Sequence, residues 1–322
     1  MKPKLSPDPR EALGPAEGFG IPYRKLVSPV MTMIVQQLVN GITQGGLYAL
    51  LAISYALVYG VMNMVNFSTG SIYMLGAVGG WLVCNYIMED FFLSLAAGFA
   101  IGFAAAFLLE KMAFKSIRGI SRISSLICTI GFSQLINELA ALLFGKATKG
   151  MPAMFAQPAF TFVGVTISYL QLILMLTVVT LLVCLQLLVY KTRVGLAIRT
   201  VSMDNATAGL MGIHVDKTIS LAFSLSGACA AIAGVAGCIY YRSVSAYMGW
   251  TPGIKAFSAA VFGGLQSMPG AILGGYLMGI IESFGVQVFS TGYRDVISFV
   301  VMIIFLLVRP TGLLGKKKIT KV

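Results

Sequence analysis

Charged residues are scarce in this 322-residue chain, at 11%, against about 25% in ordinary soluble domains. Apolar residues reach 57%, against roughly 45–50% in such domains. A soluble fold of this size cannot bury that much apolar surface, and a disordered chain would be rich in polar residues instead. The composition therefore excludes both classes and predicts a helical protein that crosses a membrane several times.

Residues that carry catalysis or bind metals are also rare. The chain has one histidine, His214, and five cysteines without a C-x-x-C pair, which predicts neither a metal site nor a disulfide framework. No G-x-x-x-x-G-K-[S/T] nucleotide-binding motif occurs. We assign every acidic residue except Glu138 and Glu282 to loops or tails. Without paired carboxylates or a His/Cys cluster in the apolar stretches, we expect no catalytic site and no cofactor in this chain.

A polar extension, residues 1–30, is followed by eight apolar stretches. Most have the length of about 20 residues that one crossing needs. The stretch 254–288 is too long for one crossing, and its glycines and Pro269 predict two short helices that meet near Pro269. The stretch 31–60 contains Asn40, Gly41 and Gln44 and is a second candidate for a break. The stretches are 31–60, 71–88, 91–110, 122–144, 167–190, 218–240, 254–288 and 291–309.

Lysine and arginine are distributed unevenly between the connections. Thirteen lie in loops 111–122, 191–217 and 309–322, and five lie in the alternate connections. Because these residues collect in cytoplasmic loops, the first set is predicted to be cytoplasmic, and the net charge of +12 needs no nucleic-acid partner. The basic residues between Lys2 and Lys25 favour a cytoplasmic N-terminus, which would require 31–60 to cross twice or re-enter.

The predicted fold class is therefore all-α integral membrane, a polytopic helical bundle of about eight to nine transmembrane segments with broken or short helices. It occupies residues 31–315, between the polar extension 1–30 and a basic tail, 316–322.

The longest cytoplasmic loop, 191–217, carries a pattern of its own. Ala206, Leu210 and Ile213 lie at helical spacing, and Asp204 or Asn205 can cap the start of a helix. Gly209 and Gly212 would let another backbone approach closely. Two interpretations remain open from the residues: a solvated amphipathic linker, or a short helix that docks on a cytoplasmic partner.

Polar residues between two apolar stretches suggest a translocation path. The group comprises Asn63, Asn66, Ser68, Thr69 and Gly70. It is either a cytoplasmic turn or a broken helix that lines a path, with Ser68 or Thr69 as the helix cap. Glu282 lines the pore or pairs with Lys255 or Arg294. A glycine set predicts close helix packing, in the bundle core or at a dimer seam: Gly263, Gly264, Gly270, Gly274 and Gly275.

Four ordered blocks carry a family resemblance. They are N-G…G-L-Y-A-L…Y-G over 40–60, N-F-S-T-G over 66–70 with Y-M-L-G over 73–76, the loop from Gly195 through Asp204, Ala208 and L-M-G-I over 210–213, and K-A-F…G-G…P-G-A…G-G…R-P-T-G-L-L-G over 255–315. Across residues 36–315 the chain resembles the permease subunits of bacterial branched-chain amino acid ABC importers, the shorter of their two types. Ala206 stands where the family usually has Glu, and Thr69 where it has His or Gln.

The resemblance implies a non-catalytic subunit, multi-pass in the bacterial inner membrane, that translocates leucine, isoleucine and valine. It implies two cytoplasmic ATPases that bind ATP and Mg²⁺, a second permease, usually a paralogue, and an extracytoplasmic binding protein. Residues Asp204, Ala208, Gly209, Gly212 and Ile213 would then form the coupling element. Two alternatives stay open: the same scaffold importing urea, short amides or another small acid, and a stand-alone ion-coupled transporter or channel.

Overall fold

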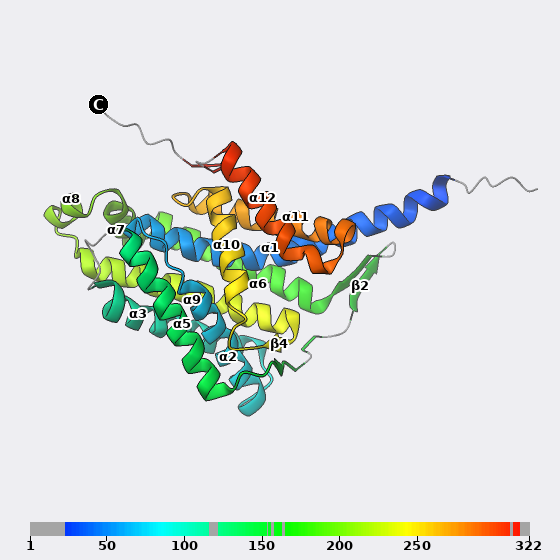
Figure 1. Cartoon of the computed structure of the whole chain (residues 1–322), viewed down its shortest axis with the longest axis horizontal. Helices are drawn as coiled ribbons and strands as arrows, with labels where there is room; N and C mark the ends of the chain where they lie inside the picture. Colours follow the sequence, from blue (N-terminus) through cyan, green and yellow to red (C-terminus); the bar gives the residue numbers. More distant parts are fainter. Residues whose placement is uncertain are drawn as a thin grey trace, which may run out of the picture.

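The computed structural model describes residues 23–115, 122–152, 154–155, 158–162, 165–309 and 312–315. The basic tail 316–322 and residues 1–22 of the polar extension lie outside these ranges. Helices make up most of the described chain, as predicted (Figure 1). They are α1 (Tyr23–Met62), α2 (Thr69–Tyr86), α3 (Phe91–Leu109), the π-helical η1 (Glu110–Phe114), α5 (Arg122–Phe144), α6 (Tyr169–Lys191), α7 (Arg193–Met203), α8 (Asn205–Leu210), α9 (Val215–Tyr241), α10 (Trp250–Gly263), α11 (Met268–Phe289), the 3₁₀ turn η2 (Thr291–Tyr293) and α12 (Arg294–Val308).

Seven of the described helical segments are long and apolar enough to cross a membrane. They are Val30–Met62, Phe91–Phe114, Ile123–Phe144, Tyr169–Lys191, Val215–Tyr241, Met268–Phe289 and Thr291–Val308. The sequence count of eight to nine also included α2 and the 14-residue α10. Both are enclosed by other helices: α2 is buried over most of its length, and α10 is packed against α1 and α11.

The predicted break in 31–60 is wrong, because α1 is one continuous helix. Its polar residues find partners in neighbouring elements. Asn40 accepts a hydrogen bond from Gln171 on α6 at 3.0 Å, and Gln44 donates to Glu282 on α11 at 2.6 Å. The helix also begins at Tyr23, so residues 23–30 belong to it and not to an extension with little fixed structure.

The two ends of α1 settle its direction. Gln36 donates to the carbonyl of Thr166 in β3 (Val165–Ser168), and Val61 packs against Ile198 of α7. In Figure 1 the start of α1 lies at the end of the molecule that carries β2 (Pro158–Phe162), and α7 and α8 lie at the other end. A single unbroken α1 therefore places its described start on the side opposite to α7 and α8. If the positive loops are cytoplasmic, as predicted, this start lies outside, whereas Lys2 to Lys25 favour the inside.

The stretch 254–288 does divide in two, as the glycines and Pro269 predict. Helix α10 ends at Gly263 and α11 begins at Met268, with Pro269 in its first turn. Gly264 has a φ of +109°, which glycine tolerates, and Ser267 caps α11 by accepting from the amide of Gly270.

Glycines and alanines bring the helix backbones together within the chain. A Cβ placed on Gly274 would lie 2.0 Å from the carbonyl oxygen of Ala259, and one on Gly275 would lie 2.4 Å from the backbone of Ala49. Gly263 and Gly270 likewise abut each other across the α10–α11 turn. Small residues allow such approach in lipid, where the helices gain packing rather than hydrophobic free energy.

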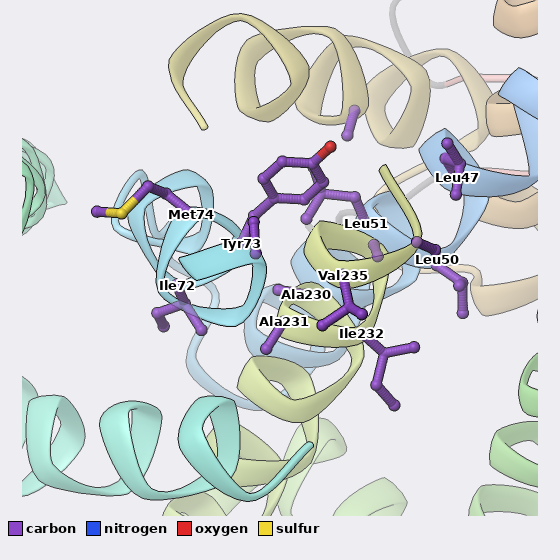
Figure 2. Packing of buried hydrophobic residues seen from close by; sticks show 14 of the residues in the cluster. Leu47, Leu50, Leu51, Ile72, Tyr73, Met74, Ala230, Ala231, Ile232 and Val235 are labelled. Carbon is purple, nitrogen blue, oxygen red and sulfur yellow. The ribbon is translucent and has the colours of Figure 1, made fainter. Parts of the chain in front are cut away.

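The apolar core lies where α1, α2 and α9 meet. Figure 2 shows Tyr73 of α2 among side chains from all three helices, including Leu51 of α1 and Val235 of α9. A Cβ on Gly234 would lie 1.9 Å from the carbonyl oxygen of Tyr73, so α9 and α2 are in backbone contact.

Two short antiparallel ribbons join the helices at the outer side. β1 (Lys149–Gly150) pairs with β4 (Ser243–Val244), and β2 pairs with β3. The first ribbon ties the α5–α6 connection to the end of α9.

We predict that Gly275→Val destabilises the fold, because the added atoms meet the backbone of Ala49 and not a flexible side chain. Overpacking of this kind costs about 1–3 kcal/mol or more. The check is the melting temperature and the monodisperse yield in detergent. Gly131→Val is the matched control, since Gly131 lies on α5 with open space around it. Equal melting temperatures for both variants and the parent would contradict the packing described here.

Candidate functional site

The cytoplasmic connection between α6 and α9 is folded into two short helices, α7 and α8. Thr192 caps α7 by accepting from the amide of Gly195 at 3.1 Å. Gly195 sits against the carbonyl oxygens of Leu188 and Val189, so the corner after α6 is too tight for a side chain. The helix predicted in loop 191–217 therefore exists, although α8 ends at Leu210 and does not reach Ile213.

Asp204 caps α8, as one of the two candidates proposed from the sequence. Its carboxylate accepts from the Thr207 hydroxyl and from the amides of Ala206 and Thr207. These hydrogen bonds, with that of the Thr207 hydroxyl first, hold the pKa of Asp204 below its ordinary value. The cap thus persists at neutral pH and is lost as pH falls through that lowered pKa.

The coupling residues divide into an anchored set and an open set. Ala208 is fully buried in a cluster with Val61, Ile198, Val201, Ile219 and Ala222, and Ile213 packs against it. Gly209 and Gly212 face open space, and Gly212 has a φ of +81°. Leu210 and Met211 are 89% and 73% exposed. Ala208 and Ile213 therefore anchor the α8 segment on α9, whereas Leu210 and Met211 project away from the chain.

The polar break between α1 and α2 packs against α5, which is long and apolar enough to cross a membrane. Ser71 bonds Ser133 at 2.7 Å, and Ser133 is the twelfth residue (133 − 122 + 1) of the 23-residue α5. At 1.5 Å per residue, this contact lies roughly 16 Å from either end of α5. The start of α2 is therefore held against the middle of α5.

The polar groups of this break form hydrogen bonds within the chain. Asn66 accepts from the amide of Ser68 at 3.0 Å, and the hydroxyl of Thr69 donates to the carbonyl of Asn66 at 2.9 Å. Ser68 occupies the cap position of α2, but its hydroxyl donates to the carbonyl of Thr129 instead, so the predicted side-chain cap is absent. Asn63 has a φ of +54° and stays exposed.

The non-helical segment between α9 and α10, which we call the second break, packs directly on the start of α2. Gly70 lies against Gly249, just before α10, such that a Cβ on Gly70 would be 2.6 Å from the Gly249 carbonyl oxygen. The hollow at this junction, beside Tyr55 and Trp250, has a volume of only about 10 Å³. That is room for about one water molecule, so the junction is closed to an amino acid in this conformation.

Glu282 lies apart from the break, in a buried polar cluster that joins four helices. Its carboxylate accepts from Gln44 at 2.6 Å, Ser298 at 2.8 Å and Lys255 at 3.0 Å, and lies 3.1 Å from the Tyr48 hydroxyl. Glu282 is fully buried and Lys255 is 2% exposed. The sequence left pore lining beside Asn66 to Gly70 and pairing with Lys255 or Arg294 open for Glu282, and the structure pairs it with both cations.

Two further charges close this cluster toward the outer side. Arg294 Nε lies 3.1 Å from Glu282 Oε1, at ion-pair distance, and Asp295 lies 2.7 Å from the Lys255 ammonium. Two positive and two negative groups thus balance. The balanced charges hold α1, α10, α11 and α12 together. Removal of one partner would leave an uncompensated buried charge, which lowers the free energy of unfolding.

Comparison with known proteins decides the family. The family described as branched-chain amino acid transport system / permease component matches residues 37–306. The chain belongs to this family. The high-affinity branched-chain amino acid transport system permease protein BraD of Pseudomonas aeruginosa is 36% identical over 306 residues, which cover 91% of this chain and all of that protein. LivH of Escherichia coli K12, with the same printed function, is 36% identical over 301 residues, 89% and 97% of the two chains.

A more distant relative and a solved structure also match this chain. The autoinducer 2 import system permease protein LsrC of Yersinia enterocolitica is 31% identical over 246 residues, 73% of this chain and 64% of that protein. A solved metal-chelate type ABC transporter in an inward-facing conformation matches with a TM-score of 0.51 at 16% identity, over 89% of this chain and 97% of the other. The second likeness concerns the fold alone.

Membership in this permease family confirms the resemblance seen in the sequence, and with it a multi-pass membrane permease component that is not an enzyme. Sequence reasoning missed Gln44, Tyr48 and Ser298 as partners of Glu282. A signal for the first two was available, because residues four apart on a helix share one face. Glu110, which we assigned to a loop, is buried at the end of α3.

We predict that Lys255→Met and Glu282→Gln each lower the melting temperature strongly, because breaking a buried ion pair costs about 3–5 kcal/mol. The double variant is expected to lose less than the sum, since it leaves no lone charge at this pair. Thermal unfolding of the four proteins in detergent measures this cycle, with the exposed Lys191→Met as control. Strictly additive losses would show that the two charges do not interact.

Proposed function

We propose that this chain is one permease subunit of an ATP-driven importer that carries leucine, isoleucine and valine across the bacterial inner membrane. The observation that carries the proposal is the 36% identity to BraD over all of that protein. The match spans 91% of this chain.

The partners follow from what the chain lacks and what it exposes. No nucleotide-binding motif occurs in the sequence, so separate subunits must bind ATP and Mg²⁺. Leu210 and Met211 project from the cytoplasmic end, where an ATPase would bind. We infer two such ATPases, an extracytoplasmic binding protein and a second permease, a paralogue of this chain.

The packing supplies a route from the ATPase to the path. Motion of α8 reaches α9 through Ala208 and Ile219, which share one buried cluster. Helix α9 touches α2 through Gly234 and Tyr73, and α2 begins at the break that packs on Gly249. Rigid helices in backbone contact move as units, so a shift of α8 would open or close the junction of the two breaks.

The function is tested by reconstitution in vesicles with the ATPases, the second permease and the binding protein. We expect leucine uptake that requires both ATP and the binding protein. Uptake driven by an ion gradient without them would favour a stand-alone transporter. Transport of urea or a short amide in preference to leucine would move the chain to another cargo on the same scaffold.

Gly209→Trp tests the coupling element. The position faces open space, with Val215 at 4.0 Å the nearest group, so the variant is expected to fold and to keep its melting temperature. The indole would occupy the surface where the ATPase docks, so we expect ATP hydrolysis to persist while leucine uptake falls at least severalfold. Gly131→Trp, at an exposed position on α5, is the control. Unchanged uptake by Gly209→Trp would exclude this surface as the contact.

A further inference from the structure

A large cavity lies away from the breaks and the buried cluster, between the end of α3, η1 and the start of α9. Its volume is about 660 Å³, within the range of small-molecule sites and far larger than the hollows near the path. The lining residues are Phe103, Phe107, Glu110, Lys111, Lys115, Asp216, Lys217, Ser220, Leu221 and Ser224. The transport mechanism above uses none of them.

Three lysines converge on this cavity from two elements. Lys111 and Lys115 come from the η1 region and Lys217 from the first turn of α9, and all three are exposed. None forms an ion pair with a residue in the described part of the chain. The two carboxylates of the cavity do have partners: Glu110 accepts from Ser220, and Asp216 also interacts. The lining therefore holds three positive and two negative groups, a net charge of +1.

Besides the charged residues and two serines, the lining is apolar and adjoins exposed apolar side chains. Phe103, Phe107 and Leu221 form one wall, and Leu108 and Met112 beside them are 56% and 71% exposed. The cavity lies on the side that the lysine and arginine excess assigns to the cytoplasm. A ligand with an anionic head and hydrocarbon tails matches such a site, since basic pockets between membrane helices bind anionic head groups.

We infer that this cavity binds one anionic phospholipid of the cytoplasmic leaflet, with its phosphate among Lys111, Lys115 and Lys217 and its acyl chains along Phe103 and Phe107. The π-helical turn Glu110–Phe114 widens the helix end at this point, and such turns occur often at functional sites.

The cavity and the coupling element contact different faces of the same turns of α9. Lys217, Ser220 and Leu221 face the cavity, whereas Ile219 and Ala222 face the buried cluster that holds Ala208. A lipid in the cavity would hold the start of α9 against α3. On the proposed function, α9 is the helix through which motion of α8 reaches the rest of the chain. A lipid bound here would therefore affect that motion.

Native mass spectrometry of the intact purified complex tests the site, with phosphatidylglycerol and phosphatidylcholine of identical chains as probes. We expect selective retention of phosphatidylglycerol. Each lysine near an anionic lipid contributes roughly a fivefold change in affinity, so Lys111→Gln/Lys217→Gln should weaken retention at least about tenfold. Lys111→Arg/Lys217→Arg should keep it. The readout does not depend on which solute is transported, so its failure is distinct from failure of the proposed function.

Lys146→Gln/Lys191→Gln is the charge-matched control, because both lysines are exposed and lie outside the cavity. It should retain phosphatidylglycerol as the parent does. Equal retention of the two lipids by the parent, equal losses in the control and the cavity variant, or bound inorganic phosphate in place of lipid would each overturn the assignment.

Discussion

Hydrocarbon offers no hydrogen bonds, so each polar group at membrane depth must find its partner inside the protein. Glu282 of α11 illustrates the consequence: three other helices, α1, α10 and α12, supply the donors that surround its carboxylate. The polar residues of α1 obey the same constraint and keep the helix intact where the sequence suggested a break. At the break that does form, Asn66 and Thr69 replace the lost helical hydrogen bonds with local ones.

Close contact between backbones is the second feature of the architecture. Glycines on α1, α9 and α11 let the helices meet without intervening side chains. Such contacts leave little room for independent sliding. A displacement at the cytoplasmic end of α9 would therefore be felt at α2, and the two breaks meet where α2 and α10 begin. The cluster around Glu282 holds α10, α11 and α12 to α1.

The cavity at the start of α9 gives the cytoplasmic end a different character. The hollows beside Gly70 and beside Tyr48 each have a volume of about 10 Å³, room for about one water molecule. The cavity at the start of α9 is much larger, and three lysines and two aromatic rings border it. A chain packed this tightly through its centre leaves its adjustable contacts at the periphery, where lipid and partner subunits are available to fill them.

Composition, the length of the apolar stretches and the glycines around Pro269 by themselves determined the class of protein, most helix positions and the division near Pro269, because lipid imposes these on any sequence. The ordered motif blocks determined the family. Tertiary structure alone decided that α1 is unbroken, that Ser68 bonds α5 and does not cap α2, and that Glu282 and Asn66 lie in different sites. Each of these depends on which distant helix supplies the partner of a polar group, and helix periodicity carries no information about that partner.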